Sequence, residues 1–167
     1  MIKAIVYFSE TGFTKKYAEA LSQMTGLQAY ALRDAIGLFD GETETIFMGW
    51  ILNDIIQGRL KAKRLFNVKM VIGVGISRIT DDQRDKLSKV NNVDKNDLFY
   101  LRGGYRPQEI RESLKSLMEM EAAVVAQIKD KSDAQNEMLD IVKNGADFIN
   151  EDYLSAVLER LYYLENA

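Results

Sequence analysis

Three hydroxyl side chains and one glycine lie within six residues near the start of the chain, in the hexapeptide Ser9-Glu10-Thr11-Gly12-Phe13-Thr14. The hydroxyl groups at positions 9, 11 and 14 and the backbone N–H groups around the glycine can converge on one phosphate. Glycine also lets the backbone approach a ligand closely. These residue types predict a phosphate-binding loop. A plainer interpretation is that Thr14 only caps a helix, but a cap needs a single Ser or Thr.

Two elements must position this loop. The apolar run Ile2–Phe8 predicts a buried first strand, and apolar residues at helical spacing from Tyr17 to Met24 predict a helix after the loop. The loop is therefore expected between a strand and a helix N-terminus, where the helix dipole favours negative charge. Proteins of the α/β class bind phosphate groups at this position.

The hexapeptide resembles the S/T-x-T-G-x-T phosphate loop of the flavodoxins, which holds the phosphate of FMN. Neither the dinucleotide fingerprint G-x-G-x-x-G nor the P-loop pattern G-x-x-x-x-G-K-S/T occurs in the chain. The resemblance implies that the hydroxyl groups and the N–H groups from Glu10 to Thr14 hold the FMN phosphate without a basic side chain. Lys15 and Lys16 are expected to be solvated helix surface.

The composition excludes several other kinds of chemistry. The 167 residues include no cysteine and no histidine, which excludes disulfides, thiol redox chemistry, Cys/His zinc sites and His-based triads. Any redox chemistry must therefore come from a bound cofactor. A net charge of −3 gives no indication of nucleic-acid binding. With no transmembrane segment and no signal peptide expected, the protein is expected to be cytoplasmic.

Strand and helix patterns alternate along the rest of the chain. The third strand is expected to end at Gly49-Trp50, before a long connection to Gly58, and the fifth is expected to stop at Gly103-Gly104. Thr80-Asp81-Asp82-Gln83 is typical of a capping box, which predicts a helix from there to about residue 90. The remaining strands are expected at Leu27–Leu32, Thr45–Met48, Val68–Ile76 and Asp97–Arg102, and a short basic helix at Arg59–Phe66.

This alternation predicts an α/β fold with a doubly wound, five-stranded parallel sheet. The flavodoxin order 2-1-3-4-5 is the natural fit. Ligands of such sheets lie beyond the carboxyl ends of the strands, at the point where the strand order reverses. The hexapeptide and the loops after the third and fourth strands are therefore expected to form one site, within a single flavodoxin-like domain.

About sixty residues follow the fifth strand, where a flavodoxin needs only one helix. An amphipathic stripe from Ile110 to Ile128, a charged break over residues 129–136, and a helical segment ending at Asn144-Gly145 predict inserted helices. The final helix, which closes the sheet, is expected to open at Asn150-Glu151-Asp152. Residues from about 105 to 143 would then be a helical insertion, whose apolar stripe is expected to be core or a homodimer contact.

This layout narrows the resemblance. The chain resembles flavodoxin-like proteins related to the menaquinone-dependent protoporphyrinogen dehydrogenases of bacteria, which also carry an insertion after the fifth strand. The segments that match are Phe99-Tyr100-Leu101-Arg102-Gly103-Gly104-Tyr105 and Ala146-Asp147-Phe148. The resemblance implies FMN as cofactor and, as partner, a redox protein or a small electron donor or acceptor such as a quinone.

The resemblance also suggests residues for the flavin ring. Gly49 and Trp50 stand where flavodoxins often place an aromatic ring beside the isoalloxazine, although Trp50 could equally pack against the inserted helices. Ser77 and Arg78 open the loop after the fourth strand, where a second aromatic is common and this chain has none. Arg78 could bind flavin carbonyls or an anionic substrate, or form a surface salt bridge. Tyr105 could supply the missing ring.

Two further residues, Asn53 and Asp54, are weaker candidates for the site. They could present backbone groups to the edge of the flavin.

Two functions stay open. The leading hypothesis is an FMN-binding redox protein, either an electron carrier or a small oxidoreductase. The alternative is a flavin-free regulatory or interaction domain that keeps the fold and the phosphate loop. A receiver domain is disfavoured, because it would need an Asp at the end of the third strand.

Overall fold

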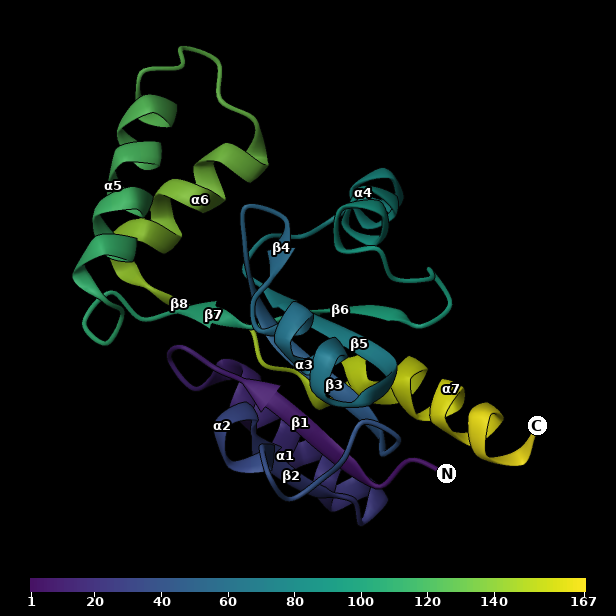
Figure 1. The fold of residues 1–167 in the computed structure, drawn as a ribbon. Helices are drawn as coiled ribbons and strands as arrows, with labels where there is room; N and C mark the ends of the chain where they lie inside the picture. Colours follow the sequence, from purple (N-terminus) through teal and green to yellow (C-terminus); the bar gives the residue numbers. More distant parts are fainter.

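Parallel strands form the centre of the molecule (Figure 1). The computed structural model describes residues 1–167, and its main sheet has the order β2-β1-β3-β5-β6, with β4 paired antiparallel to β3. Counting the parallel strands alone gives 2-1-3-4-5, the predicted flavodoxin order. The elements are β1 (Ala4–Phe8), α1 (Phe13–Thr25), β2 (Gln28–Ala31), α2 (Leu32–Ala35), β3 (Glu44–Leu52), β4 (Ile55–Ile56), α3 (Arg59–Leu65), β5 (Asn67–Gly75), α4 (Asp81–Asn91), β6 (Leu98–Arg102), β7 (Gly104–Tyr105), α5 (Glu112–Ala126), α6 (Asp133–Asn144), β8 (Ala146–Asp147), the 3₁₀ helix η1 (Glu151–Leu154) and α7 (Ser155–Asn166).

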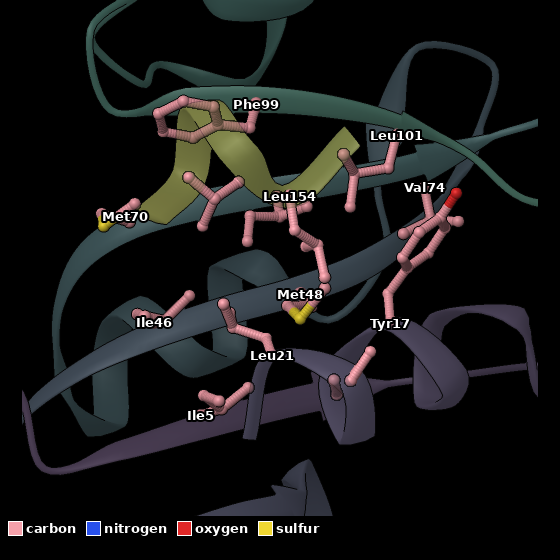
Figure 2. Packing of buried hydrophobic residues seen from close by; sticks show 14 of the residues in the cluster. Ile5, Tyr17, Leu21, Ile46, Met48, Met70, Val74, Phe99, Leu101 and Leu154 are labelled. Carbon is pink, nitrogen blue, oxygen red and sulfur yellow. The ribbon is translucent and has the colours of Figure 1, made fainter. Parts of the chain in front are cut away.

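Helices cover both faces of this sheet. One apolar cluster joins α1, η1 and α7 to the strands, and Figure 2 shows Tyr17, Leu21 and Leu154 against Ile46 and Met48 of β3. A second cluster joins α2, α3 and α4 to the opposite face. Because the inner strands are buried on both sides, they have continuous apolar sequences rather than alternating ones. The doubly wound arrangement predicted from the sequence is therefore confirmed.

The third strand differs from its prediction. β3 does not end at Gly49-Trp50 but continues to Leu52, pairing Gly49 with Phe8 of β1 and Trp50 with Val74 of β5. Gly49 is needed for close packing, because a Cβ there would lie 2.4 Å from the carbonyl oxygen of Gln57. The glycine therefore marks a close approach inside a strand and does not end it.

The expected long connection after β3 is a hairpin. Asn53 and Asp54 have φ values of 49° and 62°, the positive values that a two-residue type I′ turn requires, and the chain returns as β4. Asn91 at the end of α4 holds this hairpin: its side chain accepts from the Ile56 N–H at 2.9 Å and donates to the Asp54 carbonyl at 2.7 Å. Asn53 and Asp54 are thus turn residues, fixed in place by α4.

Other boundaries shift by one or two residues, and the predicted capping box is confirmed. Thr80 and Gln83 cap α4 reciprocally. The strands predicted at Leu27–Leu32, Val68–Ile76 and Asp97–Arg102 are observed as β2, β5 and β6. The helix predicted at Arg59–Phe66 is α3.

The segment after β6 contains two long helices, as expected. A short two-stranded ribbon, which was not expected, connects them to the sheet. Gly103-Gly104 does not simply stop the chain, because Gly104 and Tyr105 form β7, which pairs antiparallel with Ala146 and Asp147 of β8. From this ribbon α5 and α6 project away from the sheet, at the end opposite the chain termini (Figure 1). The charged break is shorter than predicted, since α6 begins at Asp133 behind a Ser132 capping box. We call residues 106–144 the helical arm.

Candidate functional site

The loop between β1 and α1 has the geometry of an anion site. Gly12 is the N-cap of α1, with φ 98°, and no side chain caps the helix. Thr14 is therefore not the cap but lies in the first turn, where it is buried. The Ser9 Oγ accepts a hydrogen bond from the Gly12 N–H at 3.1 Å, which fixes the loop and leaves the Ser9 O–H free to donate. The next N–H groups point out of the helix end and have no acceptor in the chain.

Two arginines of the helical arm reach this loop, and no local sequence pattern predicts either contact. Arg106 donates from Nη1 to the Thr11 carbonyl at 2.9 Å, and its guanidinium lies 4.4 Å from the centre of the Phe13 ring. Arg111 donates from Nε to the Glu10 carboxylate at 2.6 Å. The resemblance implied that the loop needs no basic side chain to hold a phosphate, and the structure nevertheless brings two arginines to it. Lys15 and Lys16 are exposed, as expected.

A small pocket lies between the loop, the carboxyl ends of β3 and β5, and α5. Its volume is about 80 Å³. Six of the predicted site residues line it, five from the hexapeptide together with Trp50, and α5 contributes its apolar face. The lining residues from the hexapeptide are Ser9, Glu10, Thr11, Phe13 and Thr14. Trp50 thus lines the same pocket as the loop and the inserted helix, and its place beside a flavin ring stays a prediction.

Two buried polar groups in the wall of this pocket have no hydrogen-bond partner. They are the Trp50 Nε1–H and the Tyr105 hydroxyl. Tyr105 is only 2% exposed, and burial raises the pKa of its phenol, so the hydroxyl stays protonated and can donate. An unpaired buried polar group costs about 1–3 kcal/mol. Side chains that carry this cost at a pocket wall are suited to bind a polar atom of a ligand.

A larger cleft of about 720 Å³ adjoins the pocket. It lies between the β3–β4 hairpin, α4 and the helical arm, and Ile51, Leu52 and Ile76 line both cavities. Ser77 and Arg78 line this cleft and not the small pocket. Arg78 is exposed and forms no ion pair, so the salt bridge expected for it is absent.

Some predicted site residues lie outside the two cavities. Gly12 caps α1 and Gly49 packs against the β3–β4 hairpin, and neither lines a cavity. Asn53 and Asp54 line the larger cleft at its hairpin edge.

Tyr100 also lines the larger cleft, although the sequence analysis did not name it as a site residue. Its hydroxyl donates a hydrogen bond to the Ser77 carbonyl and so orders the loop after β5. Burial raises the pKa of Tyr100 well above its usual range.

The site has no arrangement for metal binding. No group of three or more Asp or Glu side chains could hold a metal ion, and the sequence has no His or Cys. The polar groups at the pocket are hydroxyls, one indole N–H, backbone N–H groups and arginines, which are donors suited to phosphate and carbonyl oxygens.

The donor set can be compared with what FMN requires. A phosphate monoester fits the loop, because unpaired N–H groups, hydroxyls and a helix N-terminus meet there. The apolar wall and the two unpaired donors, Trp50 Nε1–H and Tyr105 O–H, suit a flat ring with carbonyl oxygens. A pocket of about 80 Å³ is smaller than a usual ligand pocket, so the ring would extend into the adjoining cleft.

Comparisons with known proteins do not assign the chain to a family. No protein-family model matches the chain, and a search of the curated proteins finds no significant match. No helix of the structure combines the length and the apolar character needed to cross a membrane.

Proposed function

We propose that this protein is a flavodoxin-like redox protein that binds FMN and acts in electron transfer, as a carrier or as a small oxidoreductase. The observation that carries the proposal is the uncapped N-terminus of α1 behind the Ser9–Thr14 loop, placed at the switch point of a 2-1-3-4-5 sheet. In the proposal the loop holds the FMN phosphate. The flavin supplies the redox chemistry, and the protein sets its exposure and potential.

The pocket wall supports the ring end of the same proposal. Trp50 offers an aromatic surface and an N–H donor, and Tyr105 offers a protonated hydroxyl. The larger cleft gives a partner access to the ring edge, and Arg78 there is free to attract an anionic group. A redox protein or a small donor or acceptor such as a quinone would be the partner, as for the proteins related to menaquinone-dependent protoporphyrinogen dehydrogenases.

One observation favours the second candidate function. α5 lies over the site and leaves only about 80 Å³ beside the loop, which suits a flavin-free regulatory or interaction domain. That domain would keep the phosphate loop and bind another phosphate compound or none.

An absorption spectrum of the purified chain, before and after addition of FMN and removal of free flavin, separates the two functions. The proposal predicts flavin bands that stay with the protein. In the double variant Ser9→Ala/Thr11→Ala, which removes two phosphate donors, affinity for FMN should fall by about tenfold or more. The control Ser116→Ala/Ser155→Ala removes two exposed hydroxyls elsewhere and should bind like the wild type. Retained affinity in the loop variant would contradict the site.

A further inference from the structure

The start of α1 lacks the acidic residue that a helix dipole favours. The helices α4, α5 and α6 have an Asp or Glu in the first turn, whereas α1, like α3 and α7, has none. Lys15 and Lys16 follow the helix start but pair with Glu19 and Asp147. Arg106 has its Nη1 3.6 Å from the position that a Cβ on Gly12 would occupy. The guanidinium of Arg106 therefore lies beside the unpaired N–H groups of the helix end.

The loop itself has one carboxylate, Glu10, and it is paired with Arg111. Arg106 has a carboxylate neighbour on its own segment, Glu109 at 3.2 Å, which is exposed and therefore weakly coupled. An anion bound at the helix end would be attracted by the guanidinium of Arg106 and by the helix dipole.

The guanidinium of Arg106 also has N–H donors that form no hydrogen bond within the protein. Both of its protein acceptors, the Thr11 carbonyl and the Glu109 carboxylate, are contacted by Nη1. No hydrogen bond from Nε or Nη2 to the protein is formed. Contact with the Phe13 ring holds the guanidinium plane beside the loop. The free edge of Nε and Nη2 has the fork geometry that binds two phosphate oxygens at once.

A second, independent feature lies in the pocket that adjoins the loop. The neighbouring side chain, Tyr105, is 2% exposed, lines the pocket beside the loop and has a hydroxyl without a partner. A ligand with a phosphate at Arg106 and a polar body in the pocket would satisfy both residues.

We propose that Arg106 recognises the charge of a terminal phosphate monoester, so that the site selects the phosphorylated form of its ligand over the form without phosphate. The inference rests on the proposed FMN site and adds to it a specificity residue supplied by the helical arm. Because Arg106 begins the arm, the same contact would hold the arm over a phosphorylated ligand.

The test compares FMN with riboflavin, which lacks the phosphate, by fluorescence titration of the wild type and of Arg106→Gln. Arg106→Gln keeps much of the side-chain volume and removes the charge. FMN affinity should fall by about tenfold or more, as expected for the loss of charge-assisted hydrogen bonds, while riboflavin affinity stays within about twofold. The control Glu10→Gln/Arg111→Gln removes the ion pair between the loop and the arm without leaving an unpaired charge in the loop, and any effect it has should be the same for both flavins.

The outcomes distinguish this inference from the proposed function. The inference fails if Arg106→Gln binds FMN like the wild type, or if its affinities for FMN and riboflavin fall equally. Arg106 would then only connect the arm to the loop, and the proposal of FMN binding would stand. If the wild type binds neither flavin, the proposed function fails, and inorganic phosphate is titrated instead, followed by ¹⁵N NMR. Phosphate-induced shifts of the Gly12 amide and the Arg106 Nε signal in the wild type, with no shift of the Gly12 amide in Arg106→Gln, would support the inference. No shifts in the wild type, or the same Gly12 shift in Arg106→Gln, would overturn it.

Discussion

Two buried tyrosines show how differently a hydroxyl can be used in this molecule. The Tyr17 hydroxyl donates to the Arg102 carbonyl at 2.6 Å and accepts from the Asn150 N–H at 3.1 Å, tying α1 to β6 and to the start of η1. The Tyr105 hydroxyl is equally buried and has no partner. The first hydroxyl stabilises the fold. The second is left unpaired, which costs stability.

Matched substitutions test this contrast. Tyr17→Phe should lower the free energy of unfolding by about 1–3 kcal/mol, because it leaves a buried N–H and a buried carbonyl unpaired. Tyr105→Phe should leave the free energy of unfolding unchanged or raise it by about 1 kcal/mol, because it removes an unpaired buried hydroxyl. Urea unfolding of both variants without ligand measures these differences. A comparable loss in Tyr105→Phe would mean that its hydroxyl has a structural partner.

At the scale of elements, the inner strands were predictable because they are buried on both faces and their apolar runs are local signals. What the sequence could not show depends on contacts between distant residues. Gly49 looks like a terminator until the Gln57 carbonyl is seen beside it. Arg106 contacts Thr11, which is 95 residues away in the sequence, and no sequence pattern predicts this contact.

Some missed features did have readable signals. Ser132-Asp133-Ala134-Gln135 is a capping box of the same kind as the one predicted for α4, and it marks the start of α6. Asn53-Asp54 between apolar residues is typical of a hairpin turn. Within the candidate site, the hexapeptide and Trp50 were predicted as neighbours and lie together, whereas Gly49 faces away from the pocket.

The helical arm is the element expected to move most readily. Neither of the two large apolar clusters includes a residue of α5 or α6. Ion pairs from Arg102 to Glu137, at 2.7 Å, and from Arg111 to Glu10 connect the arm to the rest of the chain, together with the short β7–β8 ribbon. An arm held by few buried contacts can open while the sheet stays folded.

Hydrogen exchange measures this difference. In the protein without ligand, amides of α5 and α6 should exchange through local opening at a lower free energy than those of β1, β3 and β5. FMN should slow exchange in the arm, because the proposed binding site includes the apolar face of α5. Equal protection of α5 and β3, with or without FMN, would show that the arm is a fixed part of the core.

At the scale of the whole molecule, stability at alkaline pH depends on three tyrosines. Burial raises the pKa of Tyr17, Tyr100 and Tyr105 in the folded chain. In the unfolded chain these phenols ionise near pH 10, at about the ordinary value for tyrosine. Above that pH the unfolded chain releases protons that the folded chain keeps, so stability falls as the pH rises. Below it the full contribution is present.

A tyrosinate absorbance titration tests this dependence. Tyr17, Tyr100 and Tyr105 should ionise only as the chain unfolds, so part of the absorbance change should coincide with loss of structure. Urea midpoints measured over the same pH range should decline above about pH 10. Complete ionisation of the tyrosines while the chain stays folded would contradict the burial of these three rings.

The most direct measurement of the central claim uses the single tryptophan, Trp50, which lines the pocket beside the loop. FMN is titrated into the purified chain, and the fluorescence of Trp50 and of FMN is followed together. Binding of FMN in this pocket predicts that both signals are quenched and saturate at one FMN per chain, and that Ser9→Ala/Thr11→Ala shifts the curve to higher FMN concentration. Unchanged Trp50 fluorescence at saturating FMN, or no quenching of micromolar FMN, would contradict the site.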